Sequence, residues 1–339
     1  MINQIDKNAP KIADQYCGED FEPEISVLCL TFNHREYIGQ CIEGVLAQRT
    51  HRRVEIIVHD DASTDDTRDI LIEYRNRYPG FIKLVLQDEN QFTKGNVVLS
   101  LGIKHCRGGF VAFCHGDDHW LSPYKLQYQH ECLMKSKAGI VGNRSLILDA
   151  KNNEYVGVSG FSTNEITELT DKLVLKNSGN VVPYSSIMVN PEIKNRILEN
   201  VPPVRSHTGL QILGSLSSGM LVLPYLFTVY RVNVSGSSTE MMFSSDEKKM
   251  KMVEMKIPSL RRLRTIAPSN VTFDLDRLLA RELFIAPRSL LGKRSLSNYS
   301  ESLRNRDAKG LSIFLLAITV EFVLLSLRFF VGKVKKLIF

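Results

Sequence analysis

Short apolar segments alternate with segments of helical periodicity from Glu24 onward, and this alternation constrains the fold more than any other feature of the chain. The segments read in turn as strand, helix, strand, helix and strand, over 25–31, 35–48, 54–59, 63–78 and 81–86. Ser63 and Asp66 form a capping-box pattern at the start of the second helix. Such an alternation predicts an α/β fold with a mainly parallel sheet.

The apolar run Phe110 to Cys114 ends abruptly at two adjacent carboxylates, Asp117 and Asp118. In open α/β sheets ligands bind just beyond the carboxyl ends of the strands. Paired oxygen ligands at that point suit Mg²⁺ or Mn²⁺ carrying a diphosphate, because both are hard cations that keep positions open for phosphate oxygens. A solvated helix cap ahead of Ser122 would give the same residues without a site.

The rest of the chain divides into further elements and then changes character near Ser238. We expect helices over 95–105 and 123–137, a strand over 140–149 and polar loops over 149–170. A strand over 181–189, a short helix over 210–216 and an apolar run over 220–232 should follow. The expected organisation is a polar leader over 1–22, an α/β domain over 23–238 and a helical region over 239–339.

Composition excludes several classes of protein. The 339 residues are 43% hydrophobic and 24% charged, as in an ordinary globular protein. The net charge of +6 is not gathered into a basic tract with aromatics, so nucleic acid is not an expected partner. Six scattered cysteines without a CxxC pair indicate neither a disulfide framework nor a zinc site. With no secretion-signal pattern at the start, a cytoplasmic protein is expected.

The C-terminal segment 311–339 combines an apolar run with regularly spaced charges. Glu321, Arg328 and Lys335 lie seven residues apart and so share one stripe of a helix. Two charges near the centre of a bilayer would each cost about 3 kcal/mol. The pattern therefore predicts a helix lying in the membrane interface, which would hold the protein at the inner face of the cell membrane. The alternative is a core helix that packs on its own domain or on a second subunit, in a homo-oligomer.

Four motifs, occurring in order, together resemble those of the family 2 glycosyltransferases of GT-A fold. They are Cys29–Ile38, Val58–Asp65, Lys94–Asn96 and Gly116–Asp118, within a similarity that covers roughly Pro23 to Ser238. The resemblance implies a Rossmann-like, mainly parallel sheet flanked by helices. It also implies a divalent cation (Mn²⁺ or Mg²⁺) and transfer with inversion from a nucleotide-diphospho-sugar, most often UDP-linked. The implied acceptor is a glycan or a polyprenyl-diphosphate-linked glycan of bacterial O-antigen or capsule synthesis.

The same resemblance implies roles for residues around the donor. Thr31 and Asn33 end the first strand beside the nucleotide, and Asp61 matches the acidic residue that hydrogen-bonds the base. Asp60 and Asn96 are further donor-side candidates, as is His115, which replaces the first Asp of the usual Asp-x-Asp motif. Asp117 matches the metal-binding Asp, and Asp118 either supports the loop or faces the sugar. Helix capping by Asp61 and a solvated helix start at Asn96 are the structural alternatives.

The resemblance is weaker around the expected catalytic base and the second half of the metal site. The family places an Asp ahead of a Leu-rich helix, about twenty residues before a Tyr-Arg pair, and this chain has His207 there. An imidazole is well suited to act as a base, although a surface-loop His is the simpler interpretation. Asn233 replaces a His that can join the metal. Arg231 would either pair with the leaving diphosphate or close a core edge.

Two other functions compete with glycosyl transfer. A nucleotidyltransferase also uses a metal under a nucleotide, but it would need a Gly-rich phosphate loop that 31–37 lacks. A non-catalytic sugar-nucleotide-binding or scaffold protein would explain why His115, His207 and Asn233 replace the expected groups.

Overall fold

The computed structural model describes residues 6–15, 21–199, 207–216, 218–235 and 245–285. The chain forms two compact units, Met1–Glu240 and Met241–Phe339. Part of the expected leader is packed. Ile12, in the short 3-10 helix η1 (Ile12–Asp14), is fully buried, and the backbone of Lys11 forms an isolated antiparallel β-bridge with that of Arg49.

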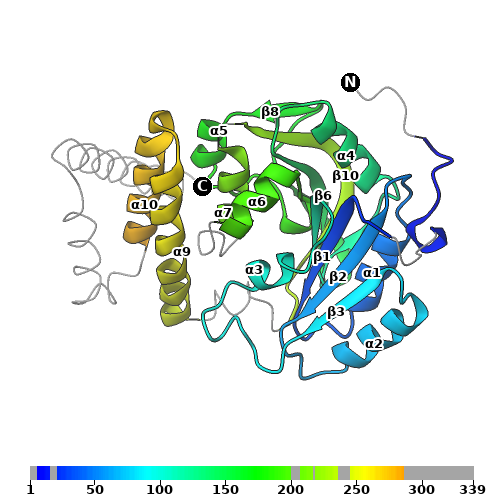
Figure 1. The fold of residues 1–339 in the computed structure, drawn as a ribbon. Coiled ribbons are helices and arrows are strands. Elements are labelled where there is room, and N and C mark those ends of the chain that lie inside the picture. The colour runs from blue at the N-terminus through cyan, green and yellow to red at the C-terminus, as the bar shows by residue number, and fades with distance from the viewer. Residues whose placement is uncertain (1–5, 16–20, 200–206, 217, 236–244, 286–339) are drawn as a thin grey trace. The chain divides into compact units, whose positions relative to one another are not determined.

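The first unit is built on one mixed sheet with the strand order β3-β2-β1-β4-β9-β6-β10-β5, to which β7 adds beside β6 and β8 beside β10 (Figure 1). The strands are β1 (Ile25–Thr31), β2 (Val54–Asp60), β3 (Ile82–Leu86), β4 (Phe110–His115), β5 (His119–Trp120), β6 (Ile140–Asp149), β7 (Glu154–Ser159), β8 (Thr167–Leu169), β9 (Met188–Val189) and β10 (Met220–Val232). Neighbours among β3, β2, β1 and β4 are parallel, as are β6 and β10, whereas β9 is antiparallel to both β4 and β6. The predicted mixed, mainly parallel sheet is confirmed.

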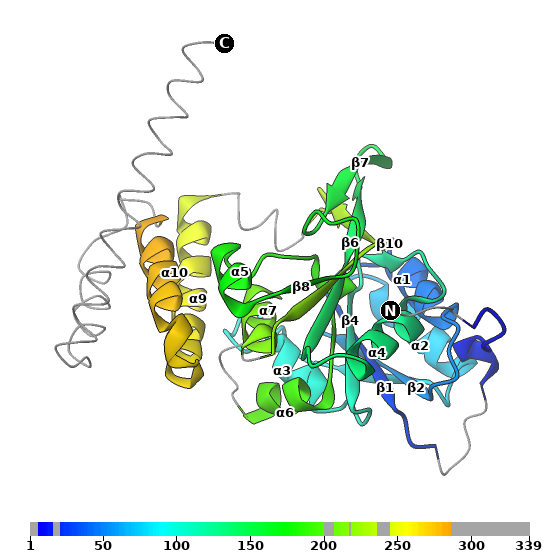
Figure 2. The same ribbon diagram turned by 90° about the horizontal axis from the view of Figure 1, so that it is seen from above.

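Helices cover both faces of this sheet (Figures 1 and 2). They are α1 (Ile38–Leu46), α2 (Thr67–Arg77), α3 (Val98–Ile103), α4 (Lys125–Met134), α5 (Asp171–Lys176), α6 (Pro191–Glu199) and α7 (His207–Ser215). Residues of α1, α2 and α4 share a core with Val27 and Cys29 of β1. On the other face α3 packs so closely that a Cβ on Gly102 would lie 2.8 Å from the Leu28 side chain. Burial on both faces explains why β1 and β2 are nearly continuous apolar runs.

Three local predictions are wrong. Helix α2 begins at Thr67 after Asp66, without a side-chain cap, because the Ser63 hydroxyl bonds Asp60 instead. The stretch 149–170 contains β7 and β8, which pair with β6 and β10 (Figure 2). The strand formers of β7, Tyr155, Val156 and Val158, stand within a stretch that is otherwise polar. The strand expected over 181–189 is reduced to β9, because Pro183 has no N–H for a strand ladder and the 3-10 helix η2 (Tyr184–Ser186) follows it.

The second unit contains two helices, α9 (Asp246–Ile266) and α10 (Thr272–Ile285), joined by the 3-10 helix η3 (Ser269–Val271). Leu263 and Leu275 are buried in it, and the Arg264 guanidinium pairs with the Asp276 carboxylate at 2.7 Å. The helical character expected after Ser238 is therefore present here, whereas the segment 311–339 lies outside the described residues.

Among the residues that the structure describes, no helix combines the length and the apolar character that crossing a bilayer requires.

Candidate active site

The candidate site lies where the strand order of the sheet reverses. Strand β1 is followed on one side by β2 and β3 and on the other by β4, so the connections diverge between β1 and β4. Thr31, Asp60 and His115 end three of these parallel strands and lie in register, Thr31 beside Asp60 and Leu30 beside His115. Such a switch point leaves a crevice at the carboxyl ends of the strands, where ligands of open α/β folds bind.

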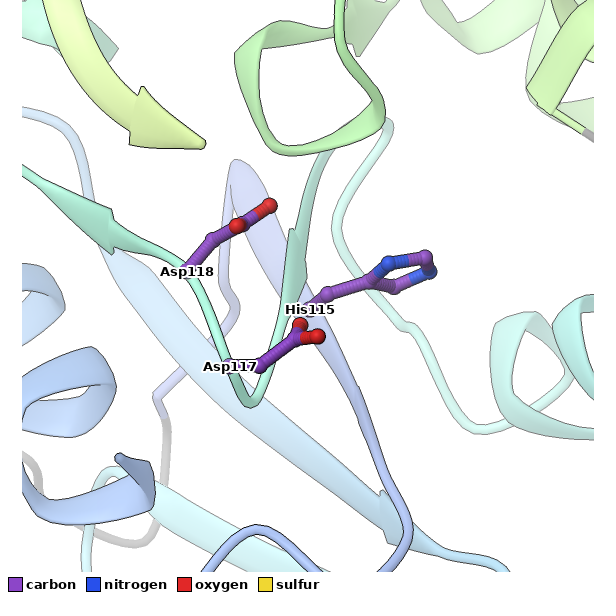
Figure 3. Close-up of side chains that lie close together, drawn as sticks. All are labelled: His115, Asp117 and Asp118. Atoms are coloured by element: carbon purple, nitrogen blue, oxygen red, sulfur yellow. The ribbon is translucent and has the colours of Figure 1, made fainter. Parts of the chain in front are cut away.

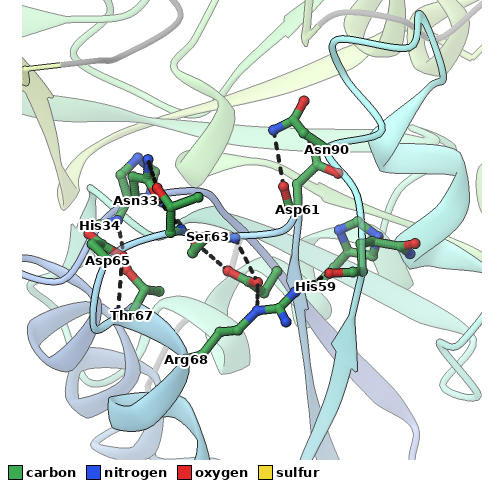
Figure 4. A network of polar contacts seen from close by, with 12 residues as sticks. Asn33, His34, His59, Asp61, Ser63, Asp65, Thr67, Arg68 and Asn90 are labelled. Atoms are coloured by element: carbon green, nitrogen blue, oxygen red, sulfur yellow. Dashed lines mark hydrogen bonds and ion pairs between the residues drawn. The ribbon is translucent and has the colours of Figure 1, made fainter.

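A network of hydrogen bonds joins the loop after β1 to the loop after β2 (Figure 4). Asn33 has a left-handed backbone with φ 56°, its backbone N–H donates to Ser63 Oγ at 2.9 Å, and its Oδ1 accepts from the Thr64 N–H at 2.8 Å. Asp60 is fully buried and accepts from Arg68 Nε at 2.8 Å and from the Ser63 N–H at 3.0 Å. Asp60 therefore holds the β2–α2 turn, and Asn33 fixes how that turn meets the end of β1.

Asp61 is directed at the loop that follows β3. Its two carboxylate oxygens accept from the backbone N–H groups of Gln91 at 2.7 Å and Phe92 at 3.0 Å, and Asn90 Nδ2 donates to the Asp61 carbonyl (Figure 4). The helix-cap contact proposed as the structural alternative is not made. Asn96, which is exposed, donates to Gln91 Oε1 at 2.7 Å at the far end of the same loop.

His115, Asp117 and Asp118 form the turn between β4 and β5, and one ligand atom from each lies within 4.8 Å of the others (Figure 3). Asp118 is 2% exposed. Its Oδ2 accepts a hydrogen bond from Ser185 Oγ at 2.5 Å, and its Oδ1 accepts one from the backbone N–H of Arg231 at 2.9 Å. Burial, and next the Asp117 charge, raise the pKa of Asp118 well above its ordinary value. Asp118 thus ties the turn to η2 and β10.

The η2 segment also positions His115. The Tyr184 ring stacks on the His115 ring with centroids 4.2 Å apart, and the backbone N–H of His115 donates to Ser185 Oγ at 2.9 Å. Burial lowers the pKa of the His115 imidazole. The ring is therefore held neutral, with a lone pair available to a ligand.

On the β1 side His34 approaches the same turn. Its Nε2 lies 3.7 Å from Asp117 Oδ2, and its Nδ1 lies 3.1 Å from Thr31 Oγ1. A Cβ on Gly116 would lie 2.5 Å from Thr31 Oγ1 and 2.8 Å from His34 Nδ1. Only glycine lets the turn pass this close to the Thr31–His34 pair.

Arg231, the penultimate residue of β10, contacts the turn from the opposite side. Its guanidinium donates to the Asp117 carbonyl and to Gln40 Oε1, and it lies 4.8 Å from the centre of the Tyr37 ring. The side chain is 7% exposed. In this structure, therefore, Arg231 braces the turn that carries Asp117.

His207 and Asn233 lie on different elements and contact different residues. His207 is the first residue of α7, is exposed, and its Nε2 lies 3.2 Å from Asn180 Oδ1. Asn180 lines a hollow of about 440 Å³ whose other walls include Phe161, Asn177 and Val182. Asn233 follows β10 with φ 59°, and its Nδ2 donates to Asp149 Oδ2 at 2.9 Å.

Comparison with known proteins agrees with this geometry. Residues 26–190 match the family model described as Glycosyl transferase family 2. This part of the chain is a family 2 glycosyltransferase domain. The matched residues include every donor-side candidate from Thr31 to Asp118 and end before His207, Arg231 and Asn233.

Two relatives of the glycosyltransferase domain cover it in part. An uncharacterized protein of Mycobacterium tuberculosis is 41% identical over 107 residues, which are 31% of this chain and 30% of that protein. The UDP-Glc:alpha-D-GlcNAc-diphosphoundecaprenol beta-1,3-glucosyltransferase WfgD of Escherichia coli is 31% identical over 135 residues, 39% of this chain and 49% of that protein. The chain thus spans less than half of the length of these relatives.

Solved structures show that the fold is of the GT-A kind. The crystal structure of S. aureus TarS 1-349 in complex with UDP aligns with 87% of this chain and 81% of its own, with a TM-score of 0.56 and 17% identity. The mannosyltransferase PcManGT from Pyrobaculum calidifontis, in complex with GDP-Man and Mn²⁺, covers 93% of this chain and 91% of its own, with a TM-score of 0.50 and 16% identity.

The residues at the β4 turn fit a divalent cation. Asp117 supplies a carboxylate that is 15% exposed, and His115 supplies a neutral imidazole on the same turn. Oxygen and imidazole donors of this kind bind Mn²⁺ and related ions. Asp118, whose oxygens already accept two hydrogen bonds, contributes through the position of the turn.

Three residues at this site had no role in the sequence analysis: His34, Tyr184 and Ser185. His34 lies within the first motif, and its place directly after the end of β1 was the available signal. Tyr184 and Ser185 gave no such signal, because they lie about seventy residues beyond the turn and reach it only through the course of the 181–187 segment.

Proposed function

We propose that this protein transfers a sugar, with inversion, from a UDP-linked sugar to a hydroxyl of a glycan or a lipid-linked glycan in the synthesis of a cell-surface polysaccharide. The observation that carries the proposal is Asp117, held at the carboxyl end of β4 beside the end of β1, within a family 2 domain. The names of the relatives support it, since the E. coli enzyme is named for a UDP-Glc donor and a diphosphoundecaprenol-linked acceptor, and TarS was crystallised with UDP.

On the donor side, the hydrogen bonds between the loops after β1 and β2 fix these two loops relative to each other. Asn33 and Thr31 lie at the end of β1 for the nucleotide, and Asp61 both orders the 90–92 loop and offers its remaining lone pairs to the N–H of a base. A divalent cation held by Asp117 would neutralise the diphosphate as it leaves. Arg231 contributes by holding the Asp117 backbone.

On the acceptor side, the proton of the attacking hydroxyl needs a base. Asp118 is a poor candidate, because it is buried and both of its oxygens already accept hydrogen bonds from the protein. We assign the role to His207, whose Nε2–H donates to Asn180 Oδ1, so that Nδ1 would be the basic nitrogen. Asn180 lies at the edge of the hollow that Phe161 and Asn177 line. That hollow is our candidate for the acceptor sugar.

The deciding experiment measures UDP release from a panel of UDP-sugars, with and without Mn²⁺, in the presence of a polyprenyl-diphosphate-linked glycan. We expect Mn²⁺-dependent UDP release that grows with acceptor and a product longer by one sugar. Tight UDP-sugar binding without product would instead identify a non-catalytic donor-binding protein. Diphosphate among the products would identify a nucleotidyltransferase.

For the location we propose attachment to the inner face of the membrane through 311–339, supported by the charged stripe of Glu321, Arg328 and Lys335. Deleting 311–339 should move the protein from the membrane fraction to the soluble fraction while activity on a short water-soluble acceptor remains. If the intact protein does not sediment with vesicles containing anionic lipid, the segment has another role, such as an oligomer contact.

A further inference from the structure

The three groups on the β4–β5 turn are not equally available to a cation. Asp118 Oδ2 accepts from Ser185 Oγ and Oδ1 accepts from the Arg231 backbone, so this carboxylate is held in place by two buried hydrogen bonds and offers a cation only its remaining lone pairs. Asp117 carries no such hydrogen bond on its carboxylate among the described residues. His115 and Asp117 are therefore the more available groups, and a further protein donor beside them would strengthen the binding of a cation.

His34 offers a further donor from the β1 side, outside the set of His115, Asp117 and Asp118 whose ligand atoms lie within 4.8 Å of one another. Its Nε2 and Asp117 Oδ2 are 3.7 Å apart, which is too long for a hydrogen bond but suits two ligands of one cation at about 2.1 Å each. Both side chains are sheltered yet reachable, with 14% and 15% of their surface exposed. The close passage of Gly116 against His34 Nδ1 keeps the imidazole beside the turn.

One tautomer of His34 presents its Nε2 to the turn in the way that metal-binding histidines do, and the contact with Thr31 suits it. With the proton on Nδ1 donated to Thr31 Oγ1 at 3.1 Å, Nε2 keeps its lone pair and faces the Asp117 carboxylate. A lone pair facing an anion is unfavourable unless a cation lies between them. A hydrogen bond from the other ring nitrogen is the usual means by which proteins orient a ligating imidazole.

We propose that His34, His115 and Asp117 together bind the divalent cation, and that this set of two imidazoles and one carboxylate selects a transition-metal ion such as Mn²⁺ over Mg²⁺. Imidazole ligands favour transition metals, whereas Mg²⁺ favours oxygen ligands and bound water. The inference rests on the proposed function for the presence of a cation, and it adds a ligand from β1 and a metal preference. His34 would replace the contribution that the family draws from the position of Asn233, which here bonds Asp149.

The test is direct metal binding to the full-length protein, with Mn²⁺ alone and with Mn²⁺ plus UDP. Free Mn²⁺ is counted by electron paramagnetic resonance, and pulsed measurements detect nitrogen coupled to bound Mn²⁺. We expect histidine nitrogen coupling in the wild type. His34→Gln should lose part of that coupling and weaken Mn²⁺ binding roughly 100-fold. Thr31→Val removes the orienting partner and should weaken binding of Mn²⁺ alone roughly tenfold; it is measured without UDP because Thr31 also lies on the proposed nucleotide side.

Two further variants separate ligation from folding. His34→Asp restores an anionic ligand, so it should regain most of the Mn²⁺ affinity while the preference for Mn²⁺ over Mg²⁺ falls. His51→Gln is the matched control, because His51 is exposed and its Nε2 contacts Asp6 Oδ2 at 2.8 Å, in no contact with the turn. Its Mn²⁺ binding should equal that of the wild type.

Absence of histidine nitrogen coupling in the wild type, or unchanged coupling and affinity in His34→Gln, would overturn the assignment. Failure of the proposed function would look different: Mn²⁺ would bind through His34 while no UDP-sugar was turned over. Conversely, Mn²⁺-dependent sugar transfer with full metal binding in His34→Gln would keep the function and remove His34 from the site.

Discussion

The two halves of the sheet build their parts of the site in different ways. In the half formed by β3, β2, β1 and β4, all neighbouring strands are parallel, and polar side chains at their carboxyl ends bond to one another across the loops. In the half formed by β9, β6, β10 and β5 the directions are mixed. There His207 begins a helix and its Nε2 contacts Asn180, whereas Asn233 follows a strand and donates to Asp149. Topology alone gathers residues in the first half, whereas loop courses decide the second.

The halves nevertheless meet at one turn. Ser185 and Arg231 come from the second half, and both hold Asp118, while Arg231 also holds the Asp117 carbonyl. In the proposed function, therefore, the first half would supply the donor-side groups, and the second half positions the turn that would hold the metal. Substitutions in the two halves should consequently separate donor binding from the chemical step.

The largest effect is expected at the turn itself. Asp117→Ala should reduce Mn²⁺-dependent UDP binding to background, because the diphosphate charge would lose its compensating cation. Calorimetric titration of UDP with and without Mn²⁺ measures this. Asp66→Ala, which removes an exposed carboxylate paired with Arg35 at 2.8 Å, is the control and should bind UDP as the wild type does. Undiminished binding by Asp117→Ala would move the metal site elsewhere.

The next effect tests the second half. His207→Ala should lower the turnover number by about 10²- to 10⁴-fold and leave the KM for the UDP-sugar nearly unchanged, because the base faces the acceptor. His207→Asp should recover part of the rate, and its acidic limb should lie at lower pH, since a carboxylate stays ionised there. Near-normal turnover in His207→Ala would leave the base unassigned and the second half without a catalytic residue.

A smaller effect distinguishes two roles of Asp61 in the first half. Asp61→Ala should weaken UDP binding by about 1–3 kcal/mol if the carboxylate accepts from the base. Asn90→Ala removes a hydrogen bond from the same loop to the Asp61 carbonyl but leaves the carboxylate in place. We expect it to weaken UDP binding much less. Equal losses in the two variants, measured by titration with UDP, would show that Asp61 acts only by holding the loop.

The predictability of the fold follows the same division. Strands β1, β2 and β4 were placed within a residue or two, because burial on both faces leaves continuous apolar runs. Strand β6 was also placed correctly at 140–149. Strand β7 was missed because it is exposed and lies in an otherwise polar stretch, although it contains Tyr155, Val156 and Val158. Strand β8 was missed because it has only three residues and pairs with β10, far along the chain. The strand expected over 181–189 failed because Pro183 interrupts it.

The site was predictable to the extent that strand ends converge. Thr31, Asp60, Asp61 and His115 could be placed at one edge of the sheet from the sequence. What each side chain bonds could not, since Asp60 bonds Arg68 and Asp61 bonds the loop after β3 only through the folded loops. The contact of His34 with Asp117 likewise depends on how two separate turns pass each other.

The last prediction concerns folding stability and rests on a buried lysine. Lys125 begins α4, is fully buried, lies 4.0 Å from the centre of the Trp120 ring and donates to Gln129 Oε1 at 2.8 Å. Burial lowers the pKa of Lys125 to about 7, against 10.5 for an exposed lysine. Between these values the unfolded chain holds the proton that the folded protein lacks, so this residue makes stability rise with pH above 7.

Lys125→Met removes this titratable group. The variant also loses the hydrogen bond to Gln129 Oε1, but the cost of that loss is the same at every pH. From pH 7 to pH 9 the wild type should therefore gain about 2 kcal/mol of unfolding free energy relative to Lys125→Met, measured by urea denaturation at both values. Gln129 Nε2 donates a hydrogen bond to Asn143 Oδ1 at 3.1 Å, and Asn143 Nδ2 donates to Thr228 Oγ1. The lysine therefore belongs to a buried polar network that reaches β6 and β10. Parallel pH dependence in the two proteins would mean that Lys125 stays charged in the fold, and that this network tolerates a buried ammonium group.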